Sequence, residues 1–190
     1  MSKRFMLLGF GLAFLLQGCL LFGMIAGRAM LMANGTEVRL AVVPVDPRDF
    51  LRGDYVILSY DISRLKTAQL GGDRDFTVGD PIYVALAPDG QTWHATAIYH
   101  TYPKDVAGPV LRGRITSASQ TPNCTGPSCW EYGVDYGLEK FFVPEGAGRA
   151  LEELRNDQRL TADVAVGKDG ASVIKRLRVD GQVRYEAGLF

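Results

Sequence analysis

The chain is poor in the residues that build most metal and cofactor sites. It has three cysteines and two histidines in 190 residues. Cys124 and Cys129 supply two metal ligands, and the sequence has no second pair. His94 and His100 share an expected strand, on which they lie roughly 20 Å apart at about 3.4 Å per residue. No βαβ pattern surrounds the glycine-rich residues 146–150, which argues against a dinucleotide. We therefore expect neither a metal nor a cofactor.

The charge balance also excludes a class of partner. The whole chain is neutral, with 21 basic and 21 acidic residues. Residues 1–33 contain three basic and no acidic residues, so the remainder has 18 basic and 21 acidic residues, a net charge of −3. Because a nucleic-acid-binding domain needs a concentrated basic face, we expect no nucleic acid partner.

One stretch has no charged side chain at all. Residues 5–27 are 23 residues long and include one strongly polar side chain, Gln17. As a helix they would span roughly 34 Å at about 1.5 Å per residue, enough to cross a hydrocarbon core. We interpret residues 1–33 as a cytoplasmic tip, a signal-anchor helix and a short connector that begins at residue 28. A cleaved secretory signal and a lipoprotein signal ending at Cys19 are alternatives, which the apolar residues beyond Cys19 disfavour.

The flanking charges predict the orientation of this anchor. Two basic residues and the amino terminus precede the apolar run, and Arg28 alone follows it closely. The positive-inside rule places the N-terminus in the cytoplasm and residues 34–190 outside it, in the periplasm if the anchor lies in an inner membrane. In that oxidising compartment Cys124 and Cys129, which bracket a short polar loop, are expected to form a disulfide. Two free thiols are the alternative.

Residues 34–190 alternate apolar and polar side chains, with turn signals roughly every eight to twelve residues, which is typical of an all-β domain. Asp-Gly pairs at three points indicate tight hairpins. Only residues 147–157 have helical periodicity. We expect a mainly-β, barrel- or sandwich-like domain with this one short helix. The expected strands are residues 37–43, 55–60, 81–87, 92–102, 110–118, 129–136, 140–143, 160–166, 171–179 and 182–186.

The most informative segment runs from Pro44 to Tyr60 and reads PVDPRDFLRGDYVILSY. A Pro-Asp-Pro turn and a Gly-Asp pair stand in front of an apolar strand. In such a pair the glycine permits a sharp turn and the aspartate accepts hydrogen bonds from amides of that turn. A second Gly-Asp pair occurs at 79–80. The charged residues of the first turn either bind a polar ligand or partner, or pair among themselves: Asp46, Arg48, Asp49, Arg52 and Asp54.

The segment resembles the signature of the GDYXXLXY family of bacterial membrane-anchored proteins, here Gly53, Asp54, Tyr55, Leu58 and Tyr60. Residues 136–152 resemble the second block of this family, with Tyr136, Glu139, Pro144 and Gly146 as the residues that we single out. The resemblance implies a single-pass inner-membrane protein without an agreed activity. Relatives are often encoded beside, or fused to, polytopic membrane proteins, so it implies such a partner. It names no small-molecule ligand.

A hydrolase is the alternative function. Ser63 and Lys66 have the Ser-x-x-Lys spacing of some serine acyltransferases, and the Gly-Asp pairs resemble those of signal-peptidase β barrels. A lysine activates a serine only when its ammonium group is desolvated, and this segment is polar. Companion motifs are missing, because Lys66-Thr67 is followed by Ala68 instead of glycine. We therefore favour an interaction or accessory module for a polytopic inner-membrane protein over a Ser–Lys hydrolase.

Overall fold

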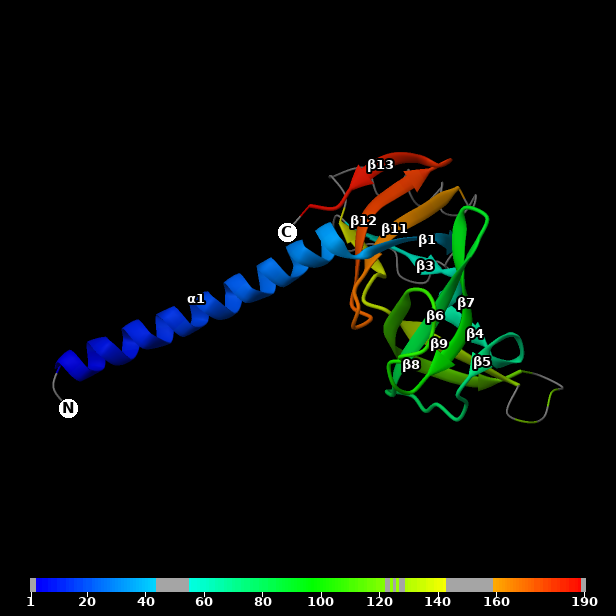
Figure 1. Ribbon diagram of the computed structural model, residues 1–190, viewed down its shortest axis with the longest axis horizontal. Coiled ribbons are helices and arrows are strands. Elements are labelled where there is room, and N and C mark those ends of the chain that lie inside the picture. Colours follow the sequence, from blue (N-terminus) through cyan, green and yellow to red (C-terminus); the bar gives the residue numbers. More distant parts are fainter. Residues whose placement is uncertain are drawn as a thin grey trace.

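The computed structural model in Figure 1 shows a long helix that projects from a β domain. It describes residues 3–43, 55–121, 124, 126, 129–142 and 159–188. Within these ranges the one α-helix is α1, Lys3–Asn34. The described end of the chain returns to the side of the domain from which α1 leaves.

Two large sheets and one two-stranded sheet make up the described part of the β domain. The larger has the order β4-β9-β8-β6-β7-β5, the smaller has the order β13-β12-β11-β1-β3, and β10 forms a separate pair with β2. All paired neighbours are antiparallel except β5 and β7. The strands are β1 Thr36–Val43, β2 Tyr55–Ile57, β3 Ser59–Tyr60, β4 Arg64–Lys66, β5 Gly71–Gly72, β6 Pro81–Asp89, β7 Thr92–Tyr99, β8 Val110–Gln120, β9 Trp130–Asp135, β10 Lys140–Phe142, β11 Leu160–Val166, β12 Ser172–Val179 and β13 Gln182–Glu186, with 3-10 helices η1 Asp61–Ser63 and η2 Thr67–Gln69.

The structure confirms the expected fold class, an apolar N-terminal helix followed by a mainly-β domain. The expected strand 55–60 is interrupted at Leu58, which separates β2 from β3. The expected strand 92–102 ends earlier, at Tyr99. The expected helix 147–157 lies outside the described residues.

α1 extends further than the sequence suggested. Residues 28–34, where the sequence suggested a short connector, continue the helix, and the first residue outside it is Gly35. The amide of Gly35 donates to the carbonyl of Leu31 at 2.9 Å. A Cβ atom on Gly35 would lie 2.7 Å from that carbonyl oxygen and 2.9 Å from Cβ of Ala165. Glycine therefore allows α1 to end directly against β11.

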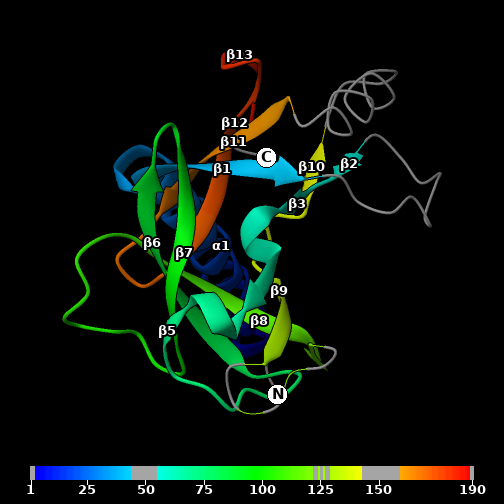
Figure 2. The ribbon, with the colours of Figure 1, turned by 90° about the vertical axis from the view of Figure 1, so that its right-hand side faces the viewer.

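The two sheets share one hydrophobic core. Alternation along β1 turns Val38, Leu40 and Val42 inward, and side chains such as Leu111 and Ile115 enter from β8. β1 packs against β7 of the other sheet, which joins the two layers (Figure 2). Each fully buried aliphatic side chain contributes about 1.5–3 kcal/mol relative to an exposed one. The β domain therefore has its own core, without any contribution from most of α1.

The second Gly-Asp pair adopts the turn that its sequence predicts. Gly79 has a φ of 98°, a left-handed value that favours glycine. The carboxylate of Asp80 accepts the amide of Thr77 at 2.8 Å and its hydroxyl at 2.9 Å. The main chain of the turn also bonds to Ile115 of β8, which fixes the start of β6. The first pair, 53–54, lies outside the described residues.

Candidate functional site

The structure brings the two motif blocks together. β2 of the first block pairs with β10 of the second. Just beyond β2, the amide of Leu58 donates to the carbonyl of Glu139 at 2.8 Å. The hydroxyl of Tyr60 donates to the carbonyl of Leu138 at 2.7 Å, across 78 positions of the chain. Two segments that are remote in sequence therefore form one structural unit.

The described signature side chains are internal to this unit. Leu58 and Tyr60 are each 1% exposed. Burial, and then the nearby Glu139, raise the pKa of Tyr60 well above its usual value, so its hydroxyl stays protonated and donates. Tyr136 is also buried, and its hydroxyl donates to the carbonyl of Ile62 at 2.8 Å. These three side chains therefore hold the fold together.

Glu139 and Asp135 form a carboxyl pair in the turn between β9 and β10. Oε1 of Glu139 accepts the amide of Tyr136 at 2.8 Å, and Oδ1 of Asp135 accepts the amide of Gly137 at 2.7 Å. Burial and a hydrogen bond with Asp135 raise the pKa of Glu139 to about 7. The same bond lowers the pKa of Asp135. Below about pH 7 the pair therefore shares one proton.

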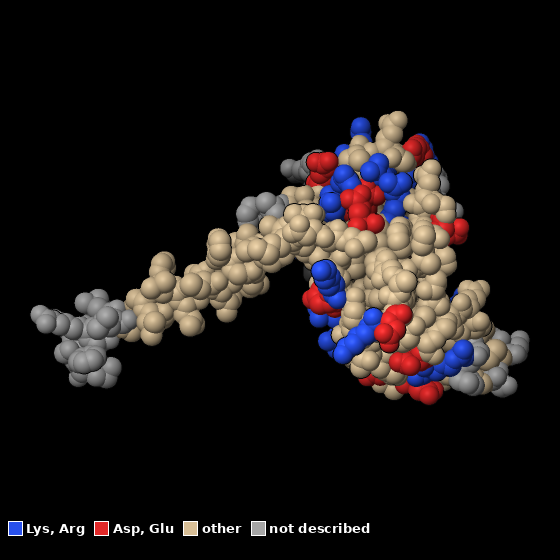
Figure 3. Space-filling view, in the orientation of Figure 1, with Lys and Arg blue, Asp and Glu red and all other residues tan. Residues whose placement is uncertain are grey.

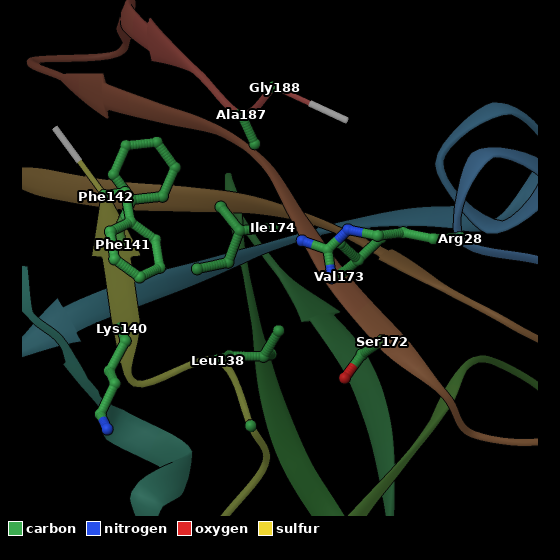
Figure 4. Close-up of a pocket in the computed structure, with 11 residues that line it drawn as sticks. Arg28, Leu138, Lys140, Phe141, Phe142, Ser172, Val173, Ile174, Ala187 and Gly188 are labelled. Atoms are coloured by element: carbon green, nitrogen blue, oxygen red, sulfur yellow. The ribbon is translucent and has the colours of Figure 1, made fainter. Parts of the chain in front are cut away.

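A groove of about 410 Å³ lies where the second block faces the end of α1. We call it the α1 groove. Figure 4 shows Phe141 and Phe142 of β10 on one side, Ile174 and Val173 of β12 between them and α1, and the guanidinium of Arg28 reaching in from α1. Phe142 is 75% exposed. The hollow therefore combines apolar side chains with a cation at its edge.

Arg28 is the one charged side chain in the helix between residues 5 and 34. It is exposed, and no carboxylate of the described residues forms an ion pair with it. Lys140 also lines the α1 groove. The groove therefore presents positive charge beside an apolar surface.

Ser63 and Lys66 are not brought together by a hydrogen bond in the described part of the chain. Oγ of Ser63 instead accepts the amide of Tyr60 at 3.0 Å. Ser63 lines a second, polar hollow of about 410 Å³ with serines of β8, Ser117 and Ser119. Lys66 is exposed at the end of β4 and does not line that hollow. The described contacts of Ser63 are therefore structural.

The side chains of the remaining motif residues lie outside the described part of the structure. The side chain of Tyr55 lies outside the described part of the structure, although its backbone pairs with Phe142. The same holds for whole residues of both blocks, namely Asp46, Arg48, Asp49, Arg52, Gly53, Asp54, Pro144 and Gly146.

The expected disulfide is confirmed. Cys124 and Cys129 are bonded, with Cα atoms 5.5 Å apart. Cys129 is buried, and its carbonyl accepts the amide of Thr121 at the end of β8. The disulfide therefore closes a loop between β8 and β9. The third cysteine, Cys19, is free and exposed on α1.

Sequence reasoning missed an ion-pair cluster on the outer face of β1, β11 and β12, visible in Figure 3 near the base of α1. The carboxylate of Asp163 is 1% exposed. It accepts Nε of Arg39 at 2.9 Å, of Arg176 at 3.1 Å and of Arg178 at 2.7 Å. Burial raises the pKa of Asp163, but the hydrogen bonds from Arg39 and Arg178 outweigh it and lower the pKa overall. The alternation of side chains along each strand places these residues on one face of the sheet. Only the register between the strands brings them into contact.

Comparison with known proteins supports the resemblance of the two blocks. The model of the GDYXXLXY protein family matches residues 17–177, which include both blocks and most of the β domain. No curated protein and no solved structure matches the chain. Since the match covers far more than half of the sequence, this chain belongs to the GDYXXLXY family.

Proposed function

We propose that this protein is a membrane-anchored interaction module that serves a polytopic inner-membrane protein as an accessory subunit. α1 spans the membrane once with the N-terminus in the cytoplasm, and the β domain lies in the periplasm. The proposal depends chiefly on one observation, the exposure of α1. The most apolar 18-residue stretch within Gly9–Asn34 has a mean hydropathy of 1.9, and none of it is buried by the domain.

The apolar side chains of such a helix must be shielded from water. Large apolar side chains along α1, such as Phe10, Phe14 and Phe22, are more than two-thirds exposed. Leaving side chains of this size in water costs about 1.5–3 kcal/mol each compared with burying them. Lipid chains can cover such a surface. The helices of a polytopic protein can also cover it, because small residues at the contact let two helices pack closely.

The signature itself supports a scaffold role. The described signature side chains, Leu58 and Tyr60, are buried, and the hydroxyls of Tyr60 and of Tyr136 in the second block donate to backbone carbonyls. A family whose signature residues stabilise the fold shares a structure and need not share a reaction. This favours a binding module over an enzyme. The orientation is supported by the two basic residues, Lys3 and Arg4, before the apolar run.

Co-purification tests this proposal. The full chain, tagged at its C-terminus, is extracted in mild detergent beside a variant in which residues 5–27 are replaced by an unrelated apolar helix of equal length. We expect a polytopic membrane protein to co-elute with the native chain in a fixed ratio, and to be lost from the helix-replaced variant. Absence of a membrane protein from the native sample, or equal recovery with both chains, would contradict the role assigned to α1.

A further inference from the structure

We propose that the α1 groove binds one glycerophospholipid, with the phosphate on Arg28 and an acyl chain against the apolar wall. The inference depends on the membrane anchoring proposed above, but not on the polytopic partner. It assigns a ligand class to a hollow that lies at the junction of α1 with the β domain.

The position of the groove along α1 is the first argument. A hydrocarbon core of about 30 Å needs roughly 20 helical residues, and the uncharged run 5–27 supplies 23. Arg28 directly follows this run and therefore emerges at the level of the lipid phosphates. Because the last turns of α1 pack on β11 and β12, the groove beside them opens at the same level.

The walls of the groove are the second argument. Its floor is formed by core side chains, with Phe141 5% and Ile174 6% exposed. At the rim stands Phe142, whose ring is largely exposed and lies above this floor in Figure 4. Covering such a ring with hydrocarbon is favourable by about 1.5–3 kcal/mol. An acyl chain in the groove would contact the floor and the rim together.

Charge complementarity is the third argument. The guanidinium of Arg28 points into the groove and has no carboxylate partner among the described residues (Figure 4). A guanidinium matches a phosphate oxygen pair with two parallel hydrogen bonds. Ser172 of β12 lines the same hollow. A volume of about 410 Å³ falls in the usual range for ligand sites, about 300–1,000 Å³.

Native mass spectrometry of the full chain tests the inference. The delipidated protein in detergent is titrated with phosphatidylglycerol, and the fraction carrying one lipid is measured. We expect a first lipid to bind in a saturable way. Arg28→Gln should weaken it about tenfold, because a charge-assisted contact is lost. Phe142→Ser, at an exposed position, should weaken it as well.

Two further variants distinguish lipid binding in the groove from unspecific lipid binding elsewhere on the protein. Ser172→Phe fills the hollow and keeps Arg28, so it should abolish binding of the first lipid. Arg64→Gln changes the same charge on β4, far from α1 in Figure 1, and should bind as the native chain does. Circular dichroism checks that all four variants keep the β fold.

Equal lipid binding by native, Arg28→Gln and Ser172→Phe chains would overturn the inference. So would unchanged lipid binding combined with loss of a co-purifying membrane protein in Arg28→Gln, because the groove would then hold a protein. A chain that binds the lipid in the groove but captures no polytopic protein would uphold this inference and contradict the partner role alone.

Discussion

Asp163 shows how a charged residue is accommodated inside a strand that reads as apolar. Its carboxylate is almost fully buried and accepts three arginine donors from the two neighbouring strands. The donor Arg39 is 124 positions away, so the contact exists only once β1 and β11 are in register. Sequence reasoning had no means of finding it, whereas the local spacing of Cys124 and Cys129 was enough to predict their disulfide.

Replacing Asp163 should destabilise the domain strongly. Asp163→Asn leaves three guanidinium groups close together without their shared counter-charge. Removing one partner of a buried ion pair costs about 3–5 kcal/mol, and we expect the lower end of that range because the arginines are partly exposed. Urea unfolding of the full chain in detergent measures the loss. Arg159→Gln, which breaks the exposed pair with Asp180, is the control and should cost no more than about 1 kcal/mol.

At the same scale, Glu139 should make stability depend on pH. Its pKa is raised from 4.5 to about 7 in the folded protein, so the folded state binds a proton that the unfolded state has released. The favourable contribution is therefore present at low pH and is lost as the pH rises from about 4.5 through 7.

The variant Glu139→Gln should remove this slope and be more stable than the native chain at pH 8. Unfolding midpoints between pH 5 and pH 8 measure it. A native chain whose midpoint rises over this interval, relative to the variant, would contradict the assignment of the raised pKa to Glu139.

At the scale of elements, alternation and turn signals were sufficient for the long strands. β1, β6, β8, β11 and β12 each contain seven residues or more and were expected nearly where they lie. β4, β5 and the two 3-10 helices have only two or three residues each, too few for a period to appear. The α1 groove was also missed, because α1, β10 and β12 meet only in the folded chain.

The junction between α1 and β11 should depend on the absence of a side chain at residue 35. Gly35→Ala would place Cβ too close to the carbonyl of Leu31 and to Ala165. We expect α1 to separate from β11, so the amide of residue 35 should exchange its hydrogen faster. Gly23→Ala is the matched control, because nothing lies within 4 Å of the added Cβ. Equal exchange at residue 35 in both variants would show that the close contact is not needed.

At the scale of the whole molecule, the chain has two parts with different requirements. The β domain buries its own apolar side chains, whereas those of α1 remain exposed along the helix (Figure 3). Cys19 lies within an uninterrupted α1, so the helix continues for 15 residues beyond the point at which a lipoprotein tether would begin. Both observations support the proposal that α1 lies in the membrane and that the disulfide-bonded domain lies outside the cytoplasm.

A pair of reporter fusions after Phe190 tests this central claim most directly. Alkaline phosphatase folds only outside the bacterial cytoplasm, and the second reporter is a fluorescent protein that matures only inside it. The account predicts an active phosphatase and a dark fluorescent protein. A fluorescent fusion with an inactive phosphatase would place the β domain in the cytoplasm and contradict the account.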